Sequence, residues 1–150
     1  MTVQSTHGVL DAAQIAKLIP HHGDMCLLGS VQQYDAQSIR CSASSHRVLT
    51  NPLREQGMLH AVCGVEYAAQ AMAVHGALLS GQSDKPPRGG RLASVRAVEF
   101  SVARLDDVGA DLEICATQLM GDESSMVYEF TVTAATRTLL KGKATVVLVS

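Results

Sequence analysis

Hydrophobic residues recur along this chain at two spacings, and each spacing predicts a different kind of element. Residues 38–45 alternate between apolar and polar side chains, which is typical of a strand with one buried face. Residues 59–79 instead hold 15 apolar side chains out of 21 and no proline, and Gly81 can end the run. A helix that is hydrophobic on nearly all sides is a buried helix, so the pattern predicts one long helix in the core.

Other stretches complete the predicted set of elements. A short helix at 11–19 has Asp11 as its N-cap and is stopped by Pro20. In one long strand the alternation slips near Ala97, which indicates a bulge. Further strands are predicted at 25–34, 92–105, 112–117, 126–132 and 139–149, with hairpin-like turns at 106–109 and 121–124.

The order of these elements predicts the fold class. Short turns between the last strands make them antiparallel, and a single buried helix then has to be wrapped by one curved sheet. We therefore expect one α+β domain over residues 1–150. Such a sheet has open edges that favour pairing with a second copy of the chain, so we also expect a homodimer or a higher oligomer.

Composition narrows the classes of function. With 47% hydrophobic and 17% charged residues among 150, the chain can fold around one core. Its net charge of −2 and its 3% aromatic content argue against a nucleic-acid-binding surface. The N-terminus lacks the pattern of a signal peptide, and polar residues interrupt the apolar run at 59–79. We therefore expect a cytoplasmic protein that does not span a membrane.

Common cofactor and metal motifs are missing from the sequence. Its four cysteines include no C-x-x-C pair, and no H-E-x-x-H spacing occurs. No glycine-rich phosphate loop or dinucleotide fingerprint is present either. We expect free thiols, no metal site and no cofactor.

Glu66 is the residue that most strongly suggests chemistry. It lies within the predicted buried helix, where an ionised carboxylate is costly unless it is paired or hydrogen-bonded. Gln70 follows one helical turn later on the same face and could donate to it. The carboxylate is therefore either a general acid or a packing solution bonded to its neighbours, and the sequence leaves both interpretations open.

Histidines supply the possible proton acceptors. His75 and His60 lie about 180° and 120° around the predicted helix from Glu66, so neither can share a site with it within one helix. A basic partner then comes from a loop or from another subunit. The loop candidates are His46 and the pair His21 and His22, each of which could also be a structural or exposed histidine.

Basic residues gather in the two loops that flank the predicted helix. They are Arg47, Arg54, Lys85, Arg88 and Arg91. They are either solvated surface or, where the loops border a site, groups that receive an anionic carrier or phosphate arm. The candidates for carrier binding are Arg47, Arg54 and Arg88.

Two motifs resemble a known enzyme family. Residues 19–28, IPHHGDMCLL, resemble the "PHR…LLVD" opening of bacterial 3-hydroxyacyl-acyl-carrier-protein dehydratases, and residues 64–71, GVEYAAQA, resemble their "EAxAQ" helix signature. More narrowly, NPLR at 51–54 followed by this helix is similar to the predicted dehydratases of aryl-polyene pigment gene clusters. The resemblance covers most of the chain and implies the hotdog fold, in which an antiparallel sheet wraps a long helix.

The resemblance also implies roles for individual residues. In that family two protomers form the active site, a histidine abstracts the α-proton of a thioester, and the helix acid, here Glu66, protonates the departing hydroxyl. The family's histidine segment, "GHFPxxPxMPG", is absent here. His46 ranks first as the base, and His21, which matches the "PH" element, ranks second. Substrate contacts are expected from His22, Pro52, Leu53, His60, Ala61 and Gln70.

We therefore expect a 3-hydroxyacyl-thioester dehydratase that acts on an acyl carrier protein or an acyl-CoA, as in fatty-acid or polyketide synthesis. Backbone amides at 61–64 are expected to stabilise the enolate-like oxyanion. Two alternatives remain. A hotdog acyl-thioesterase would use the same carboxylate to activate water, and a non-catalytic subunit paired with an active dehydratase homologue would explain the missing histidine segment.

Overall fold

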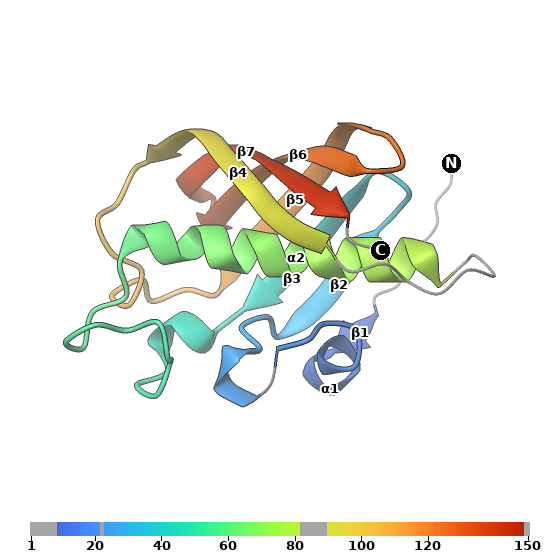
Figure 1. Ribbon diagram of the computed structural model, residues 1–150. Coiled ribbons are helices and arrows are strands. Elements are labelled where there is room, and N and C mark those ends of the chain that lie inside the picture. The colour runs from blue at the N-terminus through green and yellow to red at the C-terminus, as the bar shows by residue number, and fades with distance from the viewer. Residues whose placement is uncertain (1–8, 22, 82–89, 149–150) are drawn as a thin grey trace.

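One curved antiparallel sheet around one long helix makes up the computed structural model, which describes residues 9–21, 23–81 and 90–148 (Figure 1). The strands follow the order β1-β2-β3-β5-β6-β7-β4 across the sheet. Their bounds are β1 (Leu10–Asp11), β2 (Ser30–Tyr34), β3 (Ser38–Ala43), β4 (Gly90–Phe100), β5 (Leu112–Gly121), β6 (Ser125–Ala134) and β7 (Arg137–Leu148). This confirms the α+β class and the hotdog arrangement expected from the sequence.

The alternating strands bury the faces that their patterns predict. In β3, Ile39, Cys41 and Ala43 are at most 2% exposed. The apolar residues of β5 and β6 at alternate positions are buried in the same way, and the two strands form a hairpin at 121–124. Burial raises the pKa of the Cys41 thiol to about 12, so this cysteine is an inert core residue.

β4 occupies an edge of the sheet, where it pairs only with β7. The expected bulge is present: the register shifts between Arg96 and Glu99, and Ala97 has a φ of 54°. The expected hairpin at 106–109 is wrong, because β4 and β5 are not neighbours. The strand predicted at 92–105 ends at Phe100, and the chain then crosses to β5 at the other side of β6 and β7.

The long helix begins later than the sequence predicts. The helix α2 spans Gly64–Ser80, and the 3₁₀-helix η3 (Ala61–Cys63) precedes it. Leu59 is extended instead, because its carbonyl accepts from the Leu105 amide at 2.8 Å and the Ala61 amide donates to Ala103 at 3.0 Å. The start of α2 is seated directly on β7: a Cβ at Gly64 would lie 2.6 Å from a Leu140 methyl.

Smaller elements also differ from the sequence prediction. The helix α1 spans only Ala12–Ala16, although Asp11 caps it as expected by accepting from the Gln14 amide at 2.9 Å. The strand predicted at 25–34 begins only at Ser30, because the 3₁₀-helix η1 (Gly23–Met25) and an extended stretch precede it. The short strand β1 was not predicted.

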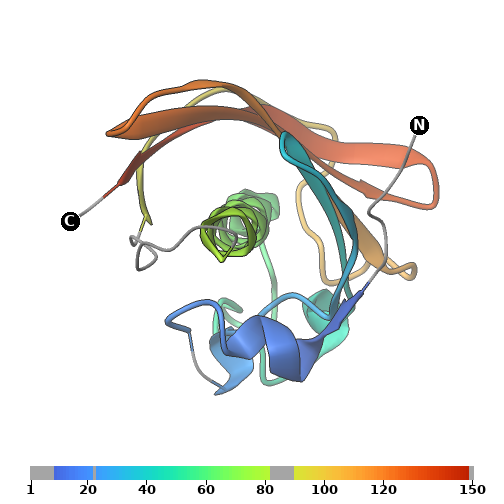
Figure 2. The ribbon, with the colours of Figure 1, turned by 90° about the vertical axis from the view of Figure 1, so that its right-hand side faces the viewer.

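The sheet covers α2 on one side only. Looking along the helix, Figure 2 shows the sheet arching over it and the N-terminal segment passing below, with one side open between the β4 edge and that segment. Side chains on the covered side, such as Tyr67 and Val74, are 0% exposed, whereas Val62 just before α2 is 60% exposed. The helix is therefore not buried on all sides, and this corrects the prediction made from the sequence. No helix in the described ranges is long and apolar enough to cross a membrane.

His75 is one of the polar groups enclosed between α2 and the sheet. Its Nε2 lies 2.8 Å from the Asp35 carbonyl and its Nδ1 lies 2.8 Å from the Tyr128 hydroxyl. A carbonyl can only accept, so Nε2 carries the proton and Nδ1 accepts from Tyr128. Burial lowers the pKa of His75, and the imidazole is neutral in the fold.

We expect acid to destabilise the protein through this histidine. The unfolded chain takes up the proton near the ordinary histidine pKa of about 6.5, whereas folded His75 resists it, so stability is lost as pH falls below that value. Urea unfolding at pH 7.5 and pH 5.5 should show a smaller pH dependence in His75→Gln than in the wild type. Burial also lowers the pKa of His46, so the variant should keep part of the pH dependence of the free energy of unfolding. An unchanged slope would contradict the assignment.

Candidate active site

Glu66 lies in the first turn of α2, half-buried on the side that the sheet leaves open. This corrects the expectation of a carboxylate in the middle of a buried helix, and the reason is the late start of α2. Within the described ranges its carboxylate makes no hydrogen bond or ion pair. Its side chain is thus accessible and uncommitted, which favours chemistry over the packing interpretation.

Gln70 ties the preceding loop to α2 one turn beyond Glu66. Its Nε2 donates to the Met25 carbonyl at 2.7 Å, and its Oε1 accepts from the Leu27 amide at 2.9 Å. Both ends of this buried amide are therefore used, and the expected bond from Gln70 to Glu66 is not made. Gln70 instead fixes the segment that begins at His21 against the helix.

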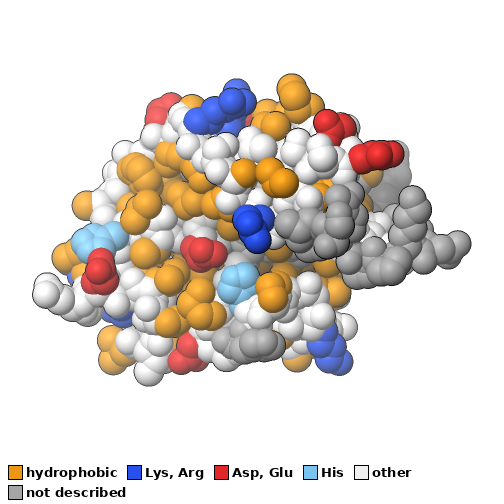
Figure 3. Space-filling model, viewed as in Figure 1, with side chains coloured by type: hydrophobic (Ala, Val, Ile, Leu, Met, Phe, Trp, Pro, Cys, Tyr) orange, Lys and Arg blue, Asp and Glu red, His pale blue; other side chains and the backbone are white. Residues whose placement is uncertain are grey.

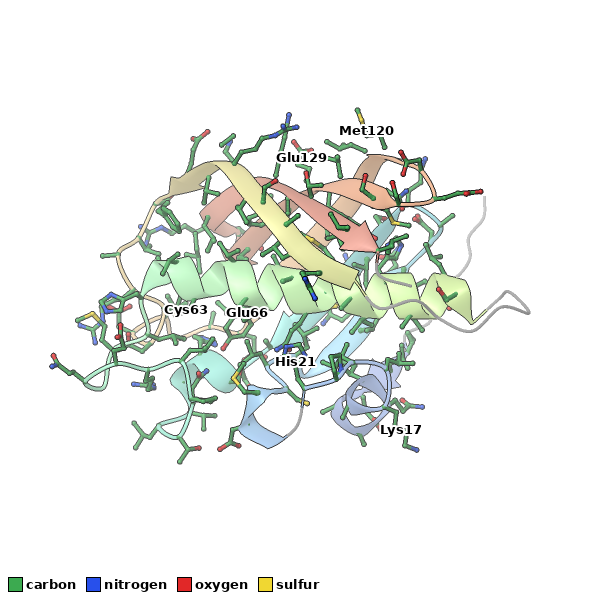
Figure 4. All side chains as sticks on the ribbon, in the orientation of Figure 1. Lys17, His21, Cys63, Glu66, Met120 and Glu129 are labelled. Atoms are coloured by element: carbon green, nitrogen blue, oxygen red, sulfur yellow. The ribbon has the colours of Figure 1, made fainter. Side chains whose placement is uncertain are left out.

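His21 lies on the same open side as Glu66. Figure 4 labels both side chains below α2, and Figure 3, in the same orientation, shows one histidine and one acidic side chain next to each other in the middle of this face. The His21 ring is half-buried, and its Nδ1 has no hydrogen-bond partner among the described residues. The structure thus brings to one surface an imidazole and a carboxylate for which the described residues provide no hydrogen-bond partner.

His46 is placed differently. It follows β3 in the 3₁₀-helix η2 (Ser45–Arg47), is 0% exposed, and directs Nε2 to the carbonyls of Val108 and Ala110 at 3.1 and 3.0 Å. Since carbonyls only accept, Nε2 carries the proton. Burial lowers the pKa of this ring, which is neutral. Its Nδ1, like that of His21, has no hydrogen-bond partner among the described residues, and the ranking of the two histidines stays a prediction.

The remaining predicted substrate residues differ in their exposure. His60 is exposed, with Nε2 3.8 Å from a Glu55 carboxylate oxygen. Pro52 is exposed, Leu53 half-buried and Ala61 buried. His22 lies outside the described residues. Their contact with substrate stays a prediction.

Two of the candidate carrier-binding arginines, Arg54 and Arg47, already have partners in the protein. Arg54 donates to three backbone carbonyls, those of His46, Val48 and Gly57, and so organises the loop before α2. Arg47 pairs with Asp111 at 2.6 Å. Arg88 lies outside the described residues. Carrier binding by these residues stays a prediction.

Most amides at the start of the helix are already in use. Those of Ala61, Cys63 and Gly64 donate to backbone carbonyls. In the part of the chain that is described, the amide of Val62 has no hydrogen-bond acceptor. Val62 is therefore the candidate oxyanion donor within the stretch that the sequence predicted.

Sequence reasoning missed three polar residues beneath Glu66: Ser45, Asn51 and Tyr67. They are hydrogen-bonded to one another, and Tyr67 and Asn51 are 0% and 5% exposed. NPLR at 51–54 was singled out only as part of a resemblance, and Tyr67 reads as one more apolar helix residue. The one available signal was the polar Asn51 directly before Pro52.

A hollow of about 680 Å³ lies elsewhere, between the 101–110 segment and the β6–β7 turn. Its two guanidinium groups are engaged, Arg104 with Asp106 and Arg137 with the Ser101 carbonyl. Neither Glu66 nor His21 lines it. The two candidate groups therefore lie on the open helix side and not in this hollow.

The fold and these two groups define a hotdog protein equipped for acid–base chemistry. A model of the ApeP-like family, described as ApeP dehydratase, matches residues 13–149. The chain therefore belongs to the ApeP dehydratase family, and it is a dehydratase, that is, a hydro-lyase.

Solved structures give the same fold. The dehydratase heterocomplex ApeI:P from Xenorhabdus doucetiae is similar with a TM-score of 0.81 and 23% identity, covering 91% of each chain. A mutant thioesterase from Pseudomonas aeruginosa gives 0.62 and 14%, covering 96% of this chain and 97% of that one. A hypothetical thioesterase with coenzyme A from Streptococcus pneumoniae gives 0.59 and 14%, covering 80% and 84%. The comparison with curated proteins gives no match.

Proposed function

We propose that this dehydratase removes water from a 3-hydroxyacyl thioester held on an acyl carrier protein, with Glu66 as the acid and His21 as the base. The observation that carries the proposal is the position of both groups on one open face, with the His21 segment tied to α2 by Gln70. His46 is the competing base, and its buried, backbone-bonded ring argues against it.

The proposed reaction needs one base, one acid and one anion donor. His21 takes the α-proton, Glu66 gives its proton to the β-hydroxyl, and the C–O bond breaks as the C=C bond forms and water leaves. Negative charge gathers on the thioester oxygen in between. The Val62 amide at the helix start is the donor we assign to that oxygen.

A direct test is mass spectrometry of a 3-hydroxyacyl carrier protein incubated with the protein. Dehydration removes the mass of one water and leaves the acyl group on the carrier. Release of the whole acyl group would instead identify a thioesterase, the activity named for several neighbours of similar fold. An unchanged carrier from the chain alone, converted once a homologous dehydratase is added, would identify a non-catalytic subunit.

The subunit alternative has support of its own. One similar structure is described as a dehydratase heterocomplex, and this chain lacks the histidine segment of the 3-hydroxyacyl-acyl-carrier-protein dehydratases that it resembles. We propose that the chain works in an oligomer, with itself or with a homologous dehydratase. The unpaired β4 edge and the uncovered side of α2 support this assembly.

We expect light scattering at micromolar concentration to give at least twice the 15.9 kDa mass of one chain. Leu92 on β4 is 37% exposed, and Leu92→Asp should shift the protein toward monomer by placing a charge at the proposed interface. Met120 on β5 is 66% exposed and gives the control Met120→Asp, which should leave the mass unchanged. A wild-type monomer would rule out the homo-oligomer.

A further inference from the structure

Three side chains beneath Glu66 form a hydrogen-bond chain with one possible direction. The Ser45 hydroxyl lies 2.7 Å from the Leu27 carbonyl and 2.7 Å from the Tyr67 hydroxyl, and Asn51 Nδ2 donates to that hydroxyl at 3.2 Å. The carbonyl can only accept, so Ser45 donates to it. Tyr67 must then donate to Ser45, and its own oxygen accepts from Asn51.

These hydrogen bonds end on a segment that has no strand partner. Leu27 lies in the extended stretch between η1 and β2, outside any strand. Its carbonyl accepts from Ser45 and its amide donates to Gln70, so side chains hold this peptide on both sides. Backbone groups that a neighbouring strand would normally satisfy are satisfied here by residues of α2 and of the loop after β3.

The same hydrogen bonds link the elements that surround the proposed site. Tyr67 directly follows Glu66 on α2, and Leu27 closes the segment that begins at His21. Asn51 also accepts from the Leu53 amide at 2.9 Å and donates to the Ser45 carbonyl at 3.0 Å. The loop before η3 is therefore fixed to the same group of hydrogen-bonded side chains. One buried tyrosine hydroxyl therefore sets both flanking loops relative to the helix acid.

We propose that Asn51, Tyr67 and Ser45 are positioning residues, here called the Tyr67 relay. They hold the segment that begins at His21 at a fixed position relative to Glu66. This inference rests on the proposed function, because it takes His21 and Glu66 as the reacting pair. Proton transfer depends steeply on geometry, and a displacement of one ångström can cost about 100-fold in rate. The relay supplies no proton of its own, since every hydroxyl hydrogen in it is already donated.

The relay and a second buried tyrosine allow a matched comparison. Tyr67→Phe removes the tyrosine hydroxyl from the relay. Tyr128→Phe removes a hydroxyl of the same kind, buried and bonded to His75 farther along α2, with no link to the His21 segment. Tyr67→Phe loses two buried hydrogen bonds, to Ser45 and from Asn51, and Tyr128→Phe loses one, so both variants report a general loss of stability.

The first readout is amide hydrogen exchange at Leu27, which needs no activity. Loss of the relay should open the segment, and we expect Leu27 to exchange roughly 10-fold faster in Tyr67→Phe, on the scale of one lost buried hydrogen bond. Tyr128→Phe should leave this rate unchanged. Equal rates in Tyr67→Phe and wild type, or equal acceleration in both variants, would overturn the proposal.

The second readout is turnover of the 3-hydroxyacyl carrier. We expect kcat to fall about 10-fold to 100-fold in Tyr67→Phe and Ser45→Ala with little change in KM, because substrate contacts remain. Ser45→Thr keeps the hydroxyl and should retain most of the rate. Faster Leu27 exchange with an unchanged kcat in an active enzyme would refute the positioning role. If the wild type forms no product, the proposed function fails, while selective exchange at Leu27 still establishes that the relay holds the segment.

Discussion

Glu66→Gln should lower turnover about 100-fold or more, the usual scale for a group that transfers a proton. The amide keeps the shape of the side chain but cannot deliver the proton that the departing hydroxyl needs. Folding should survive, because in the described structure the carboxylate makes no hydrogen bond or ion pair that the substitution would break. Steady-state rates on a 3-hydroxyacyl carrier, with thermal unfolding measured alongside, test both parts.

Glu55→Gln is the matched control for that experiment. Glu55 is an exposed carboxylate in the loop before α2, where it pairs loosely with His60 at 3.8 Å. The same chemical change there should leave the rate near that of the wild type. Retained activity in a folded Glu66→Gln protein would show that the helix acid is not part of the reaction.

His21→Ala should be the second large loss, between about 100-fold and 10,000-fold. If Glu66 and His21 act as a unit, the double variant with Glu66→Gln should be little worse than either alone, because such residues are strongly non-additive. His46→Ala should behave differently. It empties a buried site and removes the bonds to Val108 and Ala110, so it should lower the unfolding temperature more than the rate.

The comparison of the two histidines has a clear negative outcome. An inactive but folded His46→Ala protein, together with near-normal activity in His21→Ala, would restore the ranking that the sequence suggested. Full activity in both, and in His22→Ala as well, would exclude a mechanism in which one of these loop histidines is the base. A base from a partner subunit would then be the next hypothesis to test.

Local patterns predicted the strands well, because alternation reports burial directly. β3, β5 and β6 bury the side chains that their spacing selects. The start of α2 could not be read in this way. Leu59 is as apolar as the helix that follows, and what makes residues 59–60 extended is pairing with residues 103–105, more than forty positions later.

The candidate site was predictable in its residue types but not in its geometry. Glu66 and His21 were both candidates from the sequence, one from its unusual place in an apolar helix and one from its motif, and their roles stay predictions. The direction of the His46 ring depends on two carbonyls in a distant loop, which no local pattern reveals. Tyr67 was missed because its ring belongs to the core, and only its hydroxyl takes part in the polar chain.

The close packing of α2 on β7 constrains which substitutions this sequence can accept. A Cβ at position 64 would lie 2.6 Å from a Leu140 methyl, so a larger residue there requires the Leu140 side chain to shift or to become smaller. Because Glu66 follows two residues later, a shift of the helix to make room would carry the acid with it. A smaller residue at position 140 would make room for a larger residue 64 without moving the acid, so substitutions at these two positions are expected to be coupled.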